Sequence, residues 1–136
     1  MNLTLRAGEK LYINGGVIRV DRKVTIELLN DVTFLLQSHV LQAEEATTPL
    51  RQIYFAVQVL LMDPTAASYA VELAAKLIAA AAIAYRTPQI LVGLSSIGEL
   101  LIRQRYFETL KALRALYPLE QQEMFPAPAK DRSQAA

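Results

Sequence analysis

The residue types that most often perform catalysis are sparse in this chain. It has no Cys and a single His, His39, which excludes thiolate chemistry and any metal site built from Cys or several His. Ser95 and Ser96 lie in an apolar, helix-like pattern without the glycines of a nucleophile elbow. Glu44 and Glu45 are adjacent and point in different directions, so they favour a helix start rather than an acid pair. We therefore predict a protein that is not an enzyme and that holds neither a cofactor nor a metal.

Basic side chains are a better candidate for function. Residues 1–25 hold five of them against two acidic residues, on or beside short strands whose apolar alternates face a core. Such a surface could bind RNA, because Arg and Lys hold phosphates while bases stack on aromatic rings. The predicted RNA-binding residues are Arg6, Lys10, Tyr12, Arg19, Arg22 and Lys23, with Tyr12 as an exposed stacking platform. A second-choice basic face comprises Arg103, Arg105 and Lys111. The alternative is that both are ordinary solvated faces.

Composition sets the class of protein. The chain has 136 residues, of which 53% are hydrophobic, and this is enough for one domain with a core. A net charge of +1 means that any electrostatic binding must come from local patches. We expect a cytoplasmic protein with no membrane contact. The opening residues lack a secretory pattern, and the most apolar run, 77–85, is shorter than the ~20 residues of a spanning helix and is expected to be a buried core helix.

The first forty residues have the period of β-strands. Apolar and polar residues alternate in five short runs, separated by turn residues, and Asn14-Gly15 is a strong hairpin signal. We predict a small N-terminal antiparallel β-sheet, arranged as a meander or a partly open barrel. A dimer formed by edge pairing, or through an alanine-rich helix, is also expected.

From residue 44 the hydrophobic period becomes helical, which predicts an α+β fold with a C-terminal bundle of three to four helices. Thr48-Pro49, Asp63-Pro64 and Thr87-Pro88 each combine a capping residue with Pro. The expected apolar stripes are 50–61, then Tyr69 to Ala84 through Leu73, Leu77 and Ala80, then Ile90 to Leu101, then Tyr106 to Tyr117. The stripe slips near 102–105, so residues 88–117 form either two helices or one that rotates its contact face.

These patterns predict one domain over residues 1–120. Its β part is 1–42 and its helical part 43–120. Pro118 is expected to end the last helix, and 121–136 to form a disordered tail.

Several of these segments resemble the FlbT family of small bacterial regulators of flagellin expression. The matching pieces are Gly8-Glu9, Ile13-Asn14-Gly15, the run from Glu44 to Ala56, and the run from Arg105 to Leu116. The chain departs from the pattern at Gly16, where Ala is expected, and at Gln104, where Gly is expected. The second departure bears on whether a helix breaks there. The opening run from Leu3 to Ile13 is also similar to the carbon-storage-regulator family of RNA-binding β proteins.

The FlbT resemblance implies a post-transcriptional regulator. Family members are associated with the 5′ untranslated leader of flagellin mRNA, whose translation they repress or whose degradation they promote, although some act as activators. The alternative is a protein-interaction module that acts through a flagellar partner such as FlaF or flagellin. RNA binding depends steeply on salt, whereas a protein partner would show a weaker dependence.

Overall fold

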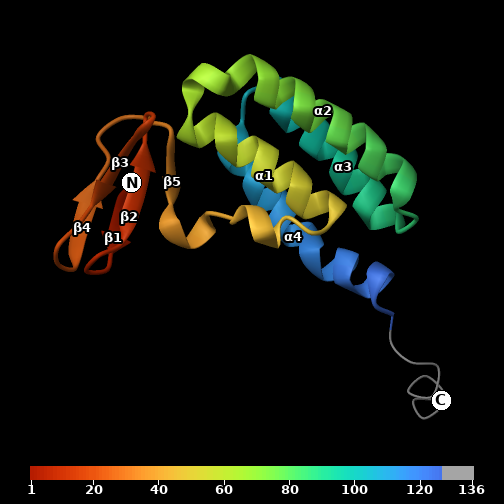
Figure 1. Cartoon of the computed structure of the whole chain (residues 1–136), viewed down its shortest axis with the longest axis horizontal. Coiled ribbons are helices and arrows are strands. Elements are labelled where there is room, and N and C mark those ends of the chain that lie inside the picture. Colours follow the sequence, from red (N-terminus) through yellow and green to blue (C-terminus); the bar gives the residue numbers. More distant parts are fainter. Residues whose placement is uncertain (127–136) are drawn as a thin grey trace, which may run out of the picture.

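The computed structural model describes residues 1–126 and has the predicted α+β architecture, with a β part beside a helical bundle (Figure 1). The antiparallel strands form two small sheets rather than one. Strands β1 (Asn2–Leu5) and β4 (Val24–Glu27) make the first sheet. The second has the order β3 (Gly16–Arg19), β2 (Lys10–Ile13) and β5 (Phe34–Leu36). Neither sheet closes, so the predicted open, antiparallel β part is confirmed, but the strand order differs from that of the expected meander because β1 pairs with β4.

The alternation of apolar residues explains how the two sheets associate. Leu3, Leu5, Leu11 and Phe34 are buried together in one small cluster, to which both sheets contribute. The tight turn before β3 has φ of +48° at Asn14 and +82° at Gly15, the left-handed conformations that the Asn-Gly pair tolerates.

Two short 3-10 helices, η1 (Gln37–His39) and η2 (Ala43–Glu45), lead from β5 into helix α1 (Pro49–Met62). The predicted cap is confirmed, because the Thr48 side chain accepts a hydrogen bond from the backbone N–H of Arg51. All six residues of the expected stripe are buried: Leu50, Ile53, Tyr54, Val57, Leu60 and Leu61.

The stripe predicted for the next helix is confirmed only at Leu73 and Leu77, which are half-buried against the helical core, whereas its other members are exposed. A 3-10 turn, η3 (Pro64–Ala66), precedes α2 (Ala67–Ala84), and the buried residues of α2 are Ala70, Ala74 and Ala81. Tyr69 is 71% exposed and Ile83 is 87% exposed. The expectation of a buried core helix is wrong, because only 17% of the residues of α2 are buried. By length and composition alone it could cross a membrane, a test that core helices of soluble proteins also pass.

The slip in the pattern marks a break between two helices, α3 (Pro88–Ile102) and α4 (Tyr106–Met124). Gln104 has φ of +61° at the break, the conformation that the expected Gly would adopt readily. The predicted faces are confirmed, with Leu94 buried on α3 and Leu110 and Leu113 buried on α4. A Cβ atom at Gly93 would lie 2.8 Å from a methyl carbon of Leu116, so glycine permits the close approach of these two helices.

Helix α4 does not end at Pro118 but continues to Met124, so residues 121–124 are helical and not part of a tail. Two side chains beyond the proline explain this continuation. Glu120 is 1% exposed and binds the start of α1, while Glu123 accepts hydrogen bonds from the backbone of Arg86 and Thr87 at the start of α3. These tertiary bonds oppose the cost of about 3 kcal/mol for Pro inside a helix. Residues 125–126 follow the helix without regular structure, and the remainder of the expected tail, 127–136, lies outside the described residues.

Candidate functional site

Five of the predicted RNA-binding residues gather at one end of the β part, which we name the basic end: Arg6, Lys10, Arg19, Arg22 and Lys23. Two turns meet there. One follows β1 and the other follows β3, and they are joined by a 2.7 Å hydrogen bond from the Gly8 N–H to the Val20 carbonyl. The antiparallel pairing of the strands on either side of these turns brings residues distant in sequence together.

The register of the strands sets like charges opposite one another. Lys10 on β2 is the direct cross-strand partner of Arg19 on β3. Arg6 and Lys23 flank the last pair of the other sheet, Leu5 with Val24, and both line a cavity of about 510 Å³. Like charges placed directly opposite destabilise a sheet. All four cations are exposed, and none forms a salt bridge within residues 1–126.

Acidic residues reduce this charge only in part. Asp21 pairs with Arg22 at 3.3 Å, where both side chains are strongly exposed. Glu9 also lines the cavity, but it accepts its hydrogen bond from the Arg6 backbone rather than from a side chain. The basic end therefore keeps a local excess of positive charge.

The prediction of Tyr12 as an exposed stacking platform is wrong. Tyr12 is half-buried and packs against the helical core, because its strand neighbour β5 carries this face of the sheet onto α1. Its cross-strand partners are Val17 and Leu35. Alternation along the strand correctly placed Tyr12 and Leu11 on opposite faces of β2. It could not show that helices also cover the face that carries Tyr12.

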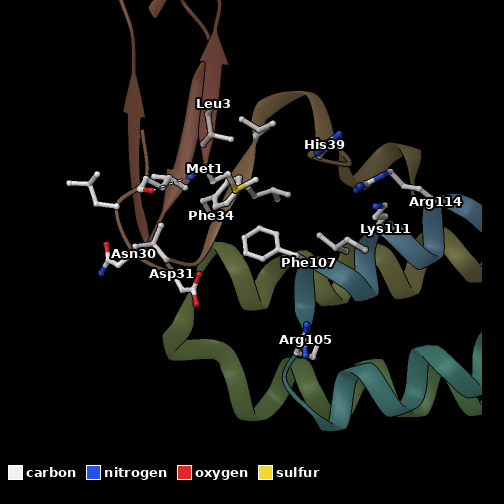
Figure 2. A pocket seen from close by; sticks show the side chains of 16 residues that line it. Met1, Leu3, Asn30, Asp31, Phe34, His39, Arg105, Phe107, Lys111 and Arg114 are labelled. Carbon is white, nitrogen blue, oxygen red and sulfur yellow. Dashed lines mark hydrogen bonds between the residues drawn. The ribbon is translucent and has the colours of Figure 1, made fainter. Parts of the chain in front are cut away.

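A second cavity, of about 790 Å³, lies between the β part and α4, and we name it the α4 cavity. Its apolar wall includes Leu3, Phe34 and Leu36 from the strands and Phe107 from α4. Phe34 and Phe107 pack against each other in this wall, with ring centroids 4.6 Å apart (Figure 2). Phe107 remains 38% exposed, whereas Phe34 is buried, so Phe107 is the ring that solvent reaches.

The second-choice basic face is divided by the structure. Arg105 and Lys111 line the α4 cavity, together with Arg114 (Figure 2). Arg103 lies in a separate hollow on α3, where it forms an ion pair with Glu99 at 3.8 Å. Arg105 forms an ion pair with Glu108.

Sequence patterns gave no indication of a structural role for Arg114. Its guanidinium donates a 2.8 Å hydrogen bond to the Tyr54 hydroxyl, and that hydroxyl donates a 2.7 Å bond to the His39 carbonyl. This relay fixes the η1 segment against α1 and α4. Burial lowers the pKa of His39 and the Arg114 charge lowers it further, so the imidazole is held neutral.

Comparisons with known proteins identify the family. The model of the family described as "Flagellar protein FlbT" matches residues 1–124. The chain belongs to the FlbT family. A probable flagellum biosynthesis repressor protein FlbT from Chelativorans sp. is 51% identical over 88% of this chain and 83% of its own length. A second, from Bradyrhizobium diazoefficiens, is 51% identical over 89% of each chain.

A third such relative, from Mesorhizobium japonicum, is 48% identical over 91% of this chain and 84% of its own length. No match was found among solved structures. The family resemblance expected from the sequence is confirmed, and these names describe a regulatory rather than an enzymatic role. The expected homodimer, the RNA leader and the flagellar protein partners stay predictions.

Proposed function

We propose that this regulator of flagellar synthesis acts by binding RNA through the basic end, and that its target is the untranslated leader of flagellin mRNA. The family and the names of its relatives support a repressor of flagellum biosynthesis. The leader as target follows from what the family resemblance implies. Repression of translation or degradation of the message would follow from occupation of that leader.

One observation carries the choice of surface. Lys10 and Arg19 are direct cross-strand partners, and Arg6 and Lys23 flank the neighbouring sheet pair at the same end. An arrangement of like charges costs stability in the free protein and is relieved when an anion lies between the cations. A phosphate backbone is the anion that spans several such positions.

The basic end offers charge without an aromatic platform, because Tyr12 packs against the helical core. Binding there is therefore dominated by phosphate contacts, which position RNA without reading bases. Any preference for a particular leader must then arise from the shape of the RNA or from a second surface.

A salt titration tests this proposal. We expect the affinity for a flagellin leader RNA, measured by fluorescence anisotropy, to fall with salt at a slope of about −0.7 per phosphate contact for single strands. Replacing both Lys10 and Arg19 with Thr should weaken binding to all RNA sequences similarly. It should also reduce the slope by about 1.4.

The same double variant should weaken RNA binding but stabilise the fold. Removing two opposed cations should raise the free energy of unfolding by about 0.2–1 kcal/mol, since like charges opposite one another destabilise a strand pair. The matched control is Lys76→Thr, an exposed Lys on α2 that pairs with Glu72 at 3.4 Å. If the double variant and the control bind RNA with unchanged affinity and slope, the basic end is not the RNA surface.

A further inference from the structure

We propose that the α4 cavity binds a small amphipathic anion, a carboxylate that carries an apolar chain. This inference goes beyond the proposed function, because RNA is assigned to the basic end and no residue of the basic end lines the α4 cavity. It rests on the size and apolar lining of the cavity, on the cations that α4 contributes to it, and on the place of Asp31 away from those cations.

The cavity has the size and the lining of a small-molecule site. Its volume of about 790 Å³ lies within the range of ~300–1,000 Å³ in which such sites usually fall. Most of its lining is apolar: Leu3 and Phe34 are buried on the strand side, and Leu110 is buried on α4. Two further apolar side chains of the lining are open to water, Leu29 at 85% and Phe107 at 38% exposed. An apolar chain that covers these two side chains removes their surface from water, which favours binding.

Two cations of the cavity come from one face of α4. Phe107, Lys111 and Arg114 follow one another at spacings of four and three residues, so their side chains share a face of the helix. Lys111 forms no salt bridge within residues 1–126. The Nη1 atom of Arg114 donates to the Tyr54 hydroxyl, which leaves the other N–H groups of the guanidinium for an anion. A headgroup bound to Lys111 and Arg114 therefore lies within reach of the exposed ring of Phe107.

Charge also sets the direction of the ligand. Asp31 lies on the loop between β4 and β5 and lines the same cavity. Figure 2 shows Asp31 on one side of the aromatic pair, and Lys111 and Arg114 on the other side. A carboxylate is attracted to α4 and repelled by Asp31, so the headgroup lies at the α4 end and the chain runs towards the loop. Arg105, which also lines the cavity, is already paired with Glu108.

The same pattern disfavours a nucleic acid in this cavity. RNA carries a negative charge on every unit of its backbone. The α4 cavity offers cations at one end, an apolar middle and a carboxylate at the other end, so it matches a ligand with a single anionic group.

His39 reports on the headgroup. It lines the cavity and is the single histidine of the chain, so its imidazole signals are identified without ambiguity. The charged and titratable groups around it are Arg114 and Lys111 on α4 and the Tyr54 hydroxyl on α1, which binds the His39 carbonyl. Burial and the charge of Arg114 lower the pKa of His39, so a carboxylate that binds Arg114 should raise that pKa again.

Decanoate tests the proposal. We expect it to bind the full chain with a Kd below about 1 mM in isothermal titration calorimetry, at concentrations at which it forms no micelles. The pKa of His39, followed by NMR, should rise on binding. Decan-1-ol and decylammonium carry the same chain without the carboxylate, and each should bind about tenfold more weakly.

Two variants separate the headgroup from the chain. Lys111→Gln removes a headgroup contact and Leu29→Ser removes a chain contact, and each should weaken decanoate binding by about threefold or more. Both side chains are exposed, so neither change should affect folding. The matched control is Arg103→Gln, which removes a cation in the separate hollow on α3 and should leave binding unchanged.

Three results would overturn the proposal: an unchanged pKa of His39 at saturating decanoate, equal binding of decan-1-ol or decylammonium, or an unchanged affinity in the Lys111→Gln variant. Vesicles of phosphatidylglycerol distinguish a free ligand from a lipid surface. The chain should stay in solution when these vesicles are sedimented. Co-sedimentation that Lys111→Gln abolishes would assign the cavity to a membrane lipid and overturn the proposal of a free ligand.

Discussion

Replacing Glu120 with Ala should lower the free energy of unfolding by about 3–5 kcal/mol, the usual cost of removing one partner from a buried ion pair. Glu120 joins the end of α4 to two other helices. Its carboxylate accepts hydrogen bonds from the Thr48 hydroxyl at 2.8 Å, the Leu50 N–H at 3.1 Å and the Arg51 guanidinium at 3.1 Å. It also accepts a hydrogen bond from the Tyr85 hydroxyl, which follows α2.

The magnitude follows from the groups that lose their acceptor. Each buried donor left without a partner costs about 1–3 kcal/mol. The Leu50 N–H and the Tyr85 hydroxyl are buried and incur most of this cost, and burial together with Glu120 raises the pKa of Tyr85, so that hydroxyl stays protonated. The Arg51 side chain is 32% exposed and can be rehydrated, which lowers its share. Glu120→Gln keeps the volume and should cost about 1.5–3 kcal/mol.

Urea unfolding followed by circular dichroism measures this effect. For a chain of this size, the midpoint of the Glu120→Ala variant should fall by about 1–3 M urea. Gln121→Ala is the matched control, because Gln121 is the exposed neighbour on the same helix turn. If the two variants unfold at the same midpoint, the carboxylate of Glu120 does not connect these helices in solution, and the account of why α4 passes through Pro118 fails.

Three further predictions concern local structure. Gly93→Ala should cost about 1–3 kcal/mol by overpacking against α4, whereas Gly98→Ala, with open space around it, should stabilise α3 by about 0.5–1 kcal/mol; equal midpoints in urea would contradict the close approach. Gln104→Gly should raise the free energy of unfolding by about 0.4–1 kcal/mol because it relieves a positive φ, and a loss of stability would contradict that backbone conformation. The hydrogen bond from the Thr87 hydroxyl lowers the pKa of Glu123, so its stabilising contribution is complete above pH 4.5 and is lost as the pH falls through the lowered value. Unfolding measured across that range should therefore show a flatter pH dependence for Glu123→Gln than for the parent chain.

Local signals predicted the elements well. Thr48-Pro49 and Thr87-Pro88 both stand at helix starts, although the Thr87 hydroxyl donates to Glu123 instead of capping its own helix. The signal at these sites is local, because the ring of Pro fixes its own φ near the helical value at the first helical position, whatever surrounds it. The buried faces of α1 and α3 were equally clear, since polar residues alternate with their apolar stripes.

The failures have a different physical cause. Helix α2 has only one narrow polar stripe, Ser68, Glu72 and Lys76, and is apolar elsewhere, so its pattern could not distinguish which of the remaining apolar faces packs against α1. The partners of Glu120 lie 35 to 72 residues away along the chain, and no local pattern indicates them. The tertiary bonds of this side chain outweigh the local rule that Pro ends a helix.

The candidate site was predictable in composition but not in arrangement. Alternation along the strands showed that Lys10 and Arg19 would be exposed, and the hairpin turn at Asn14-Gly15 placed their strands side by side. The convergence of Arg6 and Lys23 depends on the pairing of β1 with β4, which a meander would not form. The α4 cavity arises only from the packing of the β part against α4, so Lys111 and Arg114 could not be linked to the strands beforehand.

An NMR titration of the isotopically labelled chain with a flagellin leader RNA shows directly whether the basic end contacts RNA. If the basic end binds RNA, the amide signals of Arg6, Lys10, Arg19 and Lys23 shift together at one affinity, while that of Phe107 in the α4 cavity does not move. Shifts confined to α4, or no shift at RNA concentrations that exceed the protein tenfold, would contradict it.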